Sequence, residues 1–213
     1  MPLEIHKFPT GEMQANCFLL VDLSSNSAVL VDPGDRSEKI QNCISTYDFK
    51  VTHILLTHAH FDHIFGCGFF KSLFPSAKLL VHPNEIPIWT ANNEFALKFG
   101  VKTPEDYINQ PDGTFIDGEI IQIGQSKLEV VLTPGHTPGS VCFLDKEEKI
   151  AVTGDTLCGQ GIGRTDFPGG NAQQMRDSIT KLKNILENEY VIYPGHGGSA
   201  RSGRAVRVAE KMI

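Results

Sequence analysis

Several apolar runs in this sequence end in glycine-containing loops that carry histidine or aspartate. The run at residues 53–57 leads into residues 57–63, which read Thr-His-Ala-His-Phe-Asp-His. Three later runs lead into His136, Asp155 and His196, and each of these residues directly follows a glycine. Rigid strands commonly place functional side chains on the loops that follow them. We therefore expect a fold in which these strand ends converge.

The spacing within residues 57–63 predicts two groups of metal ligands. Side chains at positions i and i+2 of an extended segment project to the same side, so His58 and His60 can share one cation. Asp62 and His63 are adjacent, and after a turn they can point toward a second cation. Imidazole and carboxylate ligands together suit zinc, iron or manganese. One histidine at a strand end is usually structural, but the whole set indicates a metal site.

Apolar and turn residues predict two β-rich stretches, each followed by helix. The first stretch has expected strands at 16–23, 28–31, 53–57 and 78–81 and expected helices at 37–47 and 84–99, with residues 32–35 as a turn. The second has expected strands at 115–116, 119–123, 127–132, 141–144, 150–152 and 190–193 and expected helices at 171–188 and 202–213. This order favours an α/β or α+β fold of stacked sheets covered by helices. The length suits a single domain over residues 1–213.

Charge and hydropathy restrict the partners. The net charge of −6 disfavours nucleic-acid binding, which needs a basic surface. No apolar run approaches the ~20 residues that span a bilayer, and the N-terminal residues lack the pattern of a signal peptide. We expect a cytoplasmic protein with a small-molecule substrate and neither a nucleic-acid nor a membrane partner. The sequence leaves the oligomeric state open. The five cysteines are widely spaced and odd in number, as expected for free thiols.

The ligand pattern resembles that of the metallo-β-lactamase superfamily. Residues 57–63 match its metal motif, and His136, Asp155 and His196 match its remaining ligands. The resemblance implies a four-layer αββα sandwich with the metal site at one edge of the two sheets. It also implies one metal on His58, His60 and His136, a second on Asp62, His63 and His196, and Asp155 as the bridge.

Within that superfamily the chain looks most like the short bacterial-type members of the glyoxalase II group, the hydroxyacylglutathione hydrolases. Residues 133–140, 154–157 and 161–170 carry this likeness. Full-length glyoxalase II has a C-terminal helical domain that helps to hold glutathione, whereas seventeen residues follow His196 here. The resemblance therefore implies a short member without that domain, and it leaves the thiol carrier of the substrate open.

The expected reaction is hydrolysis of an S-acylglutathione-type thioester. Two divalent cations, with zinc favoured over iron or manganese, would share a hydroxide that attacks a polarised carbonyl. Asp62 is the candidate proton shuttle, although it could equally act only as a ligand. Arg164 is the candidate substrate contact through a forked pair with a carboxylate, but it could instead pair with Asp166 and stiffen its loop.

Three other functions compete with this one. Persulfide dioxygenases also resemble the chain, and they hold one iron with residues that match His58, His136 and Asp155. RNA processing occurs in the superfamily, but the acidic charge disfavours it. A non-catalytic metal-binding module is disfavoured by the second set of ligands.

Overall fold

The computed structural model describes residues 3–213 and shows two six-stranded sheets packed face to face. The first sheet has the order β1 (Leu3–Thr10), β2 (Ala15–Asp22), β3 (Ser27–Val31), β4 (Lys50–Leu55), β5 (Lys78–Val81) and β6 (Gly113–Thr114). The second has the order β14 (Ala200–Arg201), β13 (Val191–Pro194), β10 (Ile150–Gly154), β9 (Val141–Asp145), β8 (Ser126–Leu132) and β7 (Ile120–Ile123). A separate small hairpin pairs β11 (Leu157–Cys158) with β12 (Gly161–Ile162).

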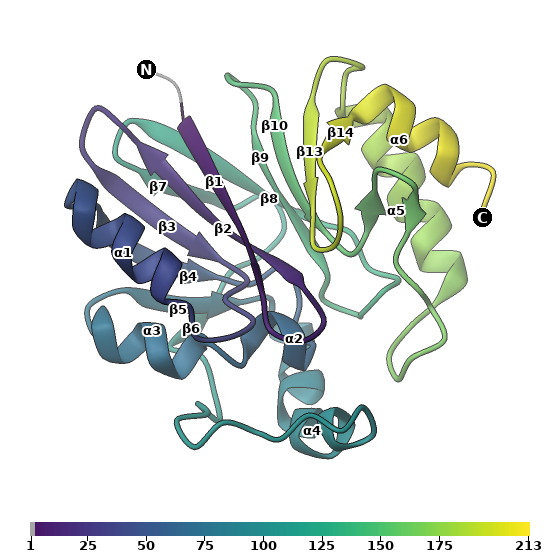
Figure 1. Cartoon of the computed structure of the whole chain (residues 1–213). Coiled ribbons are helices and arrows are strands. Elements are labelled where there is room, and N and C mark those ends of the chain that lie inside the picture. Colours follow the sequence, from purple (N-terminus) through teal and green to yellow (C-terminus); the bar gives the residue numbers. More distant parts are fainter. Residues whose placement is uncertain (1–2) are drawn as a thin grey trace.

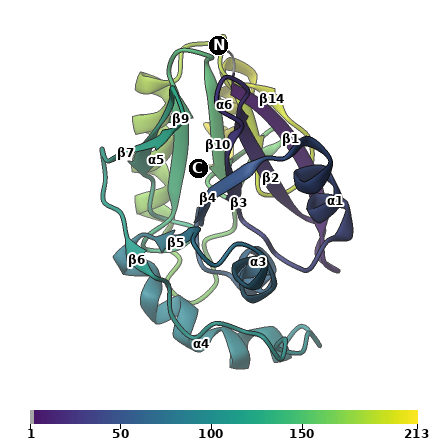
Figure 2. The same ribbon diagram turned by 90° about the vertical axis from the view of Figure 1, so that its left-hand side faces the viewer.

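Helices cover the outer faces of both sheets. α1 (Glu38–Tyr47) and α3 (Cys67–Leu73) lie on the first sheet, and α5 (Ala172–Ile185) and α6 (Ser202–Ala209) lie on the second (Figures 1 and 2). The expected αββα sandwich is therefore confirmed. Among the helices of residues 3–213, none combines the length and apolar character needed to span a bilayer.

Strand β2 shows why the layers stack in this order. Successive strand residues face opposite sides of a sheet. Leu19 and Val21 pack under the helices of the first sheet, whereas Phe18 and Leu20 face the second sheet. All eight β2 residues are buried, as expected for a strand between two apolar layers.

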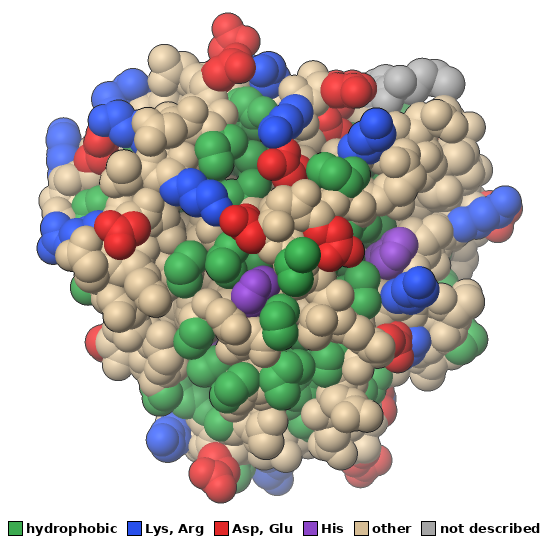
Figure 3. Space-filling view, turned by 180° about the vertical axis from the view of Figure 1, so that it is seen from behind, with side chains coloured by type: hydrophobic (Ala, Val, Ile, Leu, Met, Phe, Trp, Pro, Cys, Tyr) green, Lys and Arg blue, Asp and Glu red, His purple; other side chains and the backbone are tan. Residues whose placement is uncertain are grey.

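The remaining helices close one end of the sandwich. They are α2 (Phe61–Ile64), a 3₁₀ turn (Pro83–Glu85) and α4 (Ile86–Leu97). α4 lies at the bottom of Figure 1, with α2 above it. The expected helix at 84–99 thus begins as the 3₁₀ turn and continues as α4, which ends at Leu97. α4 buries Trp89 and leaves Ile86 and Leu97 exposed. Figure 3 shows apolar side chains gathered on the lower part of the rear face, the end of the molecule at which α4 lies.

The pattern of apolar and turn residues in the sequence did not predict β1. This strand is buried only at its two ends, Leu3 and Thr10, with exposed or half-buried residues between them, and it lies at the edge of its sheet. Its antiparallel pairing with β2, from Leu3 opposite Asp22 to Thr10 opposite Ala15, places it there. The last helix is shorter than expected, because α6 ends at Ala209 and a turn follows.

Strand direction brings one edge of the sandwich together. β10 and β13 are parallel, and β9 is antiparallel to both β10 and β8. The carboxyl ends of β8, β10 and β13 therefore point to the same edge. The amide of Val141 donates to the carbonyl of Thr57 over 2.8 Å, which joins the end of the first sheet to this edge.

Candidate metal centre

Four strand ends deliver ligand-type side chains to this edge. The segment after β4 brings His58 and His60, and the α2 turn then redirects Asp62 and His63. The loops after β8, β10 and β13 bring the remaining members of the set, which are His136, Asp155 and His196. The structure therefore places all seven of the residues expected as ligands around one centre, in two triads with Asp155 between them.

The first triad comprises His58, His60 and His136. One nitrogen from each ring lies within 4.8 Å of the other two. His60 Nδ1 lies 3.0 Å from His136 Nε2. The other ring nitrogen of His136, Nδ1, lies 2.7 Å from the carbonyl oxygen of Arg164, which fixes the ring with Nε2 toward the cluster.

The second triad comprises Asp62, His63 and His196, whose ligand atoms also lie within 4.8 Å of one another. His196 Nε2 lies 3.2 Å from Asp62 Oδ2. Asp155 lies between the two triads: its carboxylate is 3.5 Å from His136 Nε2, 3.8 Å from His63 Nε2 and 3.7 Å from His196 Nε2. One carboxylate thus reaches both groups.

The surroundings shift the pKa values of His58 and His60 in one direction and that of His63 in the other. Burial and the neighbouring imidazoles lower the pKa of His60 to about 3 and that of His58 well below its usual range, so both rings are neutral. Burial also disfavours protonation of His63, but Asp62, Asp32 and Asp155 outweigh it and raise the pKa of His63 to about 10. Neutral imidazole is the form that binds a metal.

The unpaired atoms of the cluster fit bound cations. His58 Nε2, His63 Nε2 and Asp155 Oδ1 are buried and have no hydrogen-bond partner among the described residues. A buried polar atom without a partner is costly. These three atoms belong to the two triads and to the residue between them, so cations held here would satisfy them.

Gly195 keeps this centre open. A Cβ atom at this position would clash with the Asp155 carboxylate and come within 2.7 Å of the His63 ring. Its carbonyl accepts the amide of Asn16, and Asn16 Nδ2 donates to the carbonyl of Pro194 over 2.8 Å. The loop that carries His196 is therefore fastened to β2 of the other sheet.

Asp32 is a buried residue of the site that the sequence pattern treated only as part of a turn. Its carboxylate accepts the Thr57 amide over 2.7 Å and the Thr57 hydroxyl over 2.6 Å, and it lies 3.0 Å from His63 Nδ1. These contacts orient the His63 ring and the start of the segment 57–63. The sequence did contain a signal for this site residue. Asp32 directly follows the apolar residues 28–31, just as the predicted metal ligands follow their strands.

Glu85 is a second buried acid that the sequence did not single out. Its Oε2 accepts the amide of Ala59, between two ligand-type histidines, over 2.7 Å. Its Oε1 accepts the amide of Gly139, in the loop after His136, over 2.6 Å. Asn92 holds the other backbone group of the same residue by donating to the Ala59 carbonyl over 2.5 Å. Glu85 therefore connects the loops that supply the first triad.

Arg164 lies at the rim of the centre. Its guanidinium donates to both carboxylate oxygens of Asp166, over 2.7 and 2.6 Å, and stands 3.6 Å from the centroid of the Phe167 ring. Of the two roles that the sequence left open for Arg164, this geometry is the one in which it pairs with Asp166 and stiffens its loop. The five cysteines are all free, and burial, followed by the charge of Asp155, raises the pKa of Cys158 beside the centre to about 12.

Comparison with known proteins agrees with this fold and site. The family described as the metallo-beta-lactamase superfamily matches residues 10–196. The chain therefore belongs to the metallo-β-lactamase superfamily, a family of metal-binding hydrolases.

Individual relatives carry different names. The hydroxyacylglutathione hydrolase GloC of Haemophilus influenzae is 32% identical, with 96% of each chain covered. The probable metallo-hydrolase YqgX of Bacillus subtilis is 34% identical over 90% of this chain and 89% of its own. TTHA1623, solved in a di-iron-bound form, is similar with a TM-score of 0.86 and 29% identity over 96% of this chain and 98% of its own. The BLEG-1 B3 metallo-beta-lactamase is similar with a TM-score of 0.85 and 30% identity, covering 94% and 95%.

Proposed function

We propose that this metallo-hydrolase binds two divalent cations and hydrolyses a small-molecule thioester. The observation that carries the proposal is the pair of triads with the Asp155 carboxylate between them. His58, His60 and His136 would hold one cation, and Asp62, His63 and His196 would hold the other. Asp155 would contribute to both sites.

The cations would supply Lewis acidity, which polarises the thioester carbonyl and lowers the pKa of water to near neutrality. A thiolate is a stable leaving group, so the protein need not supply a strong general acid. Asp62 is our candidate for moving the proton, because Asp62 Oδ2 lies 3.2 Å from His196 Nε2 and its carboxyl is partly exposed to the cavity. Burial opposes its ionisation, but His63 and His196 outweigh burial and keep its pKa well below the usual range.

Support for a thioester comes from the relatives and the sequence together. GloC is named as a hydroxyacylglutathione hydrolase, and residues 133–140, 154–157 and 161–170 resemble that group. The acidic net charge supports a small molecule over a nucleic acid as the substrate. Zinc is the metal that we favour, and the di-iron form of TTHA1623 makes iron the first alternative. Arg164 would contact substrate only by exchanging Asp166 for a substrate carboxylate.

Metal analysis combined with a thioesterase assay tests the proposal. We expect about two metal equivalents per chain on the pattern of the two-metal hydrolases and hydrolysis of S-D-lactoylglutathione. His58→Ala should lose metal and activity together. Lys39→Ala, an exposed change on α1, is the control and should retain both. A metal-loaded chain that cleaves a β-lactam but no thioester would contradict the proposal.

A mononuclear iron persulfide dioxygenase is the second candidate. ETHE1 of Myxococcus xanthus is similar to this chain with a TM-score of 0.75 and 27% identity. Two members of the first triad, His58 and His136, with the Asp155 carboxylate 3.5 Å from His136, offer a site of two histidines and one carboxylate. One iron per chain, with oxygen consumed on addition of glutathione persulfide, would support this candidate and exclude the thioesterase.

A further inference from the structure

One side of the metal centre is walled by aromatic rings. A cavity of about 390 Å³ is lined by residues of both triads and by Met13, Phe61, Phe95, Phe99 and Phe167. The ring centroids of Phe95 and Phe99 lie 5.1 and 5.7 Å from that of Phe167, each nearly edge to face. Phe95 also stacks on His60 of the first triad, 5.4 Å between centroids. We call Phe61, Phe95, Phe99 and Phe167 the aromatic wall.

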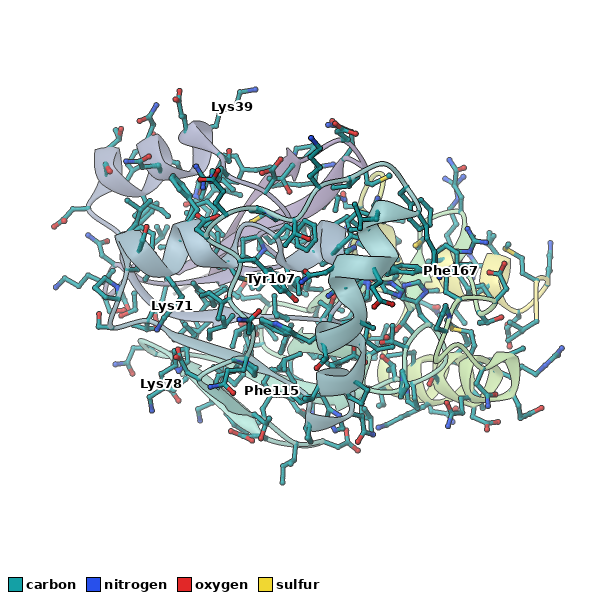
Figure 4. All side chains as sticks on the ribbon, turned by 90° about the horizontal axis from the view of Figure 1, so that it is seen from below. Lys39, Lys71, Lys78, Tyr107, Phe115 and Phe167 are labelled. Atoms are coloured by element: carbon teal, nitrogen blue, oxygen red, sulfur yellow. The ribbon has the colours of Figure 1, made fainter. Side chains whose placement is uncertain are left out.

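The aromatic wall is assembled from segments that are distant in sequence. Phe95 lies on α4, Phe99 just beyond its end, and Phe167 comes from the loop before α5. Figure 4 shows Phe167 lying beside α4. Phe99 remains 40% exposed although its neighbours are apolar. An apolar surface of this kind, open beside reactive groups, suits the apolar part of a ligand.

The other side of the centre is less aromatic and carries an unpaired cation. A second cavity, of about 460 Å³, is lined by Arg204 of α6, by Ser199 and by glycines that include Gly197 and Gly198, together with the apolar Ile162 and Met212. A Cβ atom at either of these two glycines would meet nothing within 4 Å, so the space above them is open. Arg204 forms no ion pair within residues 3–213.

The two cavities meet at the metal centre. His196, Cys158 and Ile162 line both of them. A ligand whose reacting carbon lies at the centre can therefore extend in two directions, toward the aromatic wall or toward Arg204. The two directions differ in chemistry. The first is mostly aromatic, and the Arg164 guanidinium that also lines it is already paired with Asp166. The second has the unpaired Arg204.

We propose that the centre binds its thioester across both cavities, with an apolar acyl group on the aromatic wall and an anionic thiol carrier beside Arg204. The assignment rests on the proposed thioesterase function and adds to it the acyl class and the direction of binding. The reverse orientation would leave the charge of the carrier among phenylalanine rings, where the Arg164 guanidinium is already paired with Asp166, and the apolar acyl group beside Arg204. Both placements are unfavourable. In the first the charged carrier, and in the second the guanidinium, would lose hydration without gaining a partner of opposite charge.

A series of thioesters with different acyl groups on one thiol carrier tests the role of the aromatic wall. With glutathione as the carrier and zinc-loaded protein, kcat/KM should rise from acetyl to butanoyl to phenylacetyl, after division by the alkaline hydrolysis rate of each ester. Burial of an acyl methylene corresponds to about a fourfold gain. Phe99→Ala should remove most of the gain for phenylacetyl and leave acetyl unchanged. Tyr47→Ala, an exposed aromatic 59% accessible on α1, is the matched control and should change neither.

A carrier series with one acyl group tests Arg204. Arg204→Ala should raise KM by about fivefold for a carrier with carboxylates, the upper range for an exposed ion pair, and should leave the neutral carrier N-acetylcysteamine unaffected. Coenzyme A as a third carrier separates phosphate from carboxylate recognition, since only a phosphate site would prefer it. Arg207→Ala, an exposed arginine on the same helix, is the control.

Binding of a thioether gives a readout that does not depend on turnover. S-benzylglutathione should bind the zinc-loaded protein in calorimetry, and Phe99→Ala and Arg204→Ala should each weaken it, whereas the two control variants should not. If thioesters are hydrolysed but neither variant changes acyl or carrier preference, this inference is overturned and the proposed function stands. If no thioester is hydrolysed, the proposed function fails. Thioether binding that neither variant weakens would then overturn the two-cavity assignment as well.

Discussion

Replacing Glu85 with glutamine tests whether the loops of the first triad depend on a shared anchor. Glu85 is fully buried, and each of its oxygens accepts one backbone amide, from Ala59 and from Gly139. Glutamine keeps one oxygen but turns an NH₂ group toward the other amide, so one hydrogen bond becomes a contact between two donors. The carboxylate is therefore needed at both positions, even though burial raises its pKa.

The size of the effect follows from these two hydrogen bonds. A hydrogen bond to a charged group contributes about 1.5–3 kcal/mol, and the amide left without an acceptor adds a desolvation cost of similar size. We expect Glu85→Gln to lower the free energy of unfolding of the metal-free chain by ~3–6 kcal/mol. Loss of a group that orients metal ligands typically weakens metal binding by about 10- to 100-fold, and we expect a loss in this range.

Two measurements separate anchoring from general destabilisation. Urea denaturation of the metal-free protein gives the free energy of unfolding, and competition with a chromophoric chelator gives the zinc affinity of the folded protein. Glu94→Gln, an exposed change on α4, is the matched control and should alter neither. A Glu85→Gln protein that is less stable but binds zinc as tightly as the unchanged chain would refute the anchoring role.

Other positions give further predictions. Gly195→Ala should fold but lose most of its bound metal, because the new Cβ clashes with Asp155 and approaches His63; full metal content by plasma emission analysis would contradict this. Asp22→Asn should destabilise the chain by ~1.5–3 kcal/mol without changing metal content, since Asp22 of β2 accepts the amides of Gln125 and Ser126 from the other sheet. Burial disfavours the ionised form of Asp22, but these hydrogen bonds and that of Ser24 outweigh it and lower the pKa to about 2. Its contribution should therefore be present above pH ~4 and lost as the pH falls toward 2; equal acid sensitivity of Asp22→Asn and the unchanged chain would show that Asp22 contributes nothing. Removal of metal by a chelator should lower the melting temperature, because cations bound only by the folded chain stabilise it by mass action; an unchanged melting temperature on adding zinc back would count against a site in the folded protein.

Much of the fold was predictable because its apolar strands are long and its breaks are sharp. Residues 127–132 and 141–144 became β8 and β9 with few changes in their bounds. The elements that were missed depend on a partner. β1 is half exposed and owes its place to pairing with β2, and the two-residue strands β6 and β14 exist only through a neighbouring strand.

The sequence by itself determined which side chains follow strand ends, because strand period and glycine turns are local properties. It thereby identified the seven residues that the structure brings together around one centre. Only the tertiary structure decided what surrounds them. Asp32 and Glu85 contact residues 25 to 54 positions away, and the aromatic wall joins α4 to the loop before α5. The Asp32 contact depends on which strands become neighbours in the first sheet. The Gly139 contact of Glu85 and the aromatic wall depend on how the two sheets pack against each other. No local pattern of residues encodes either arrangement.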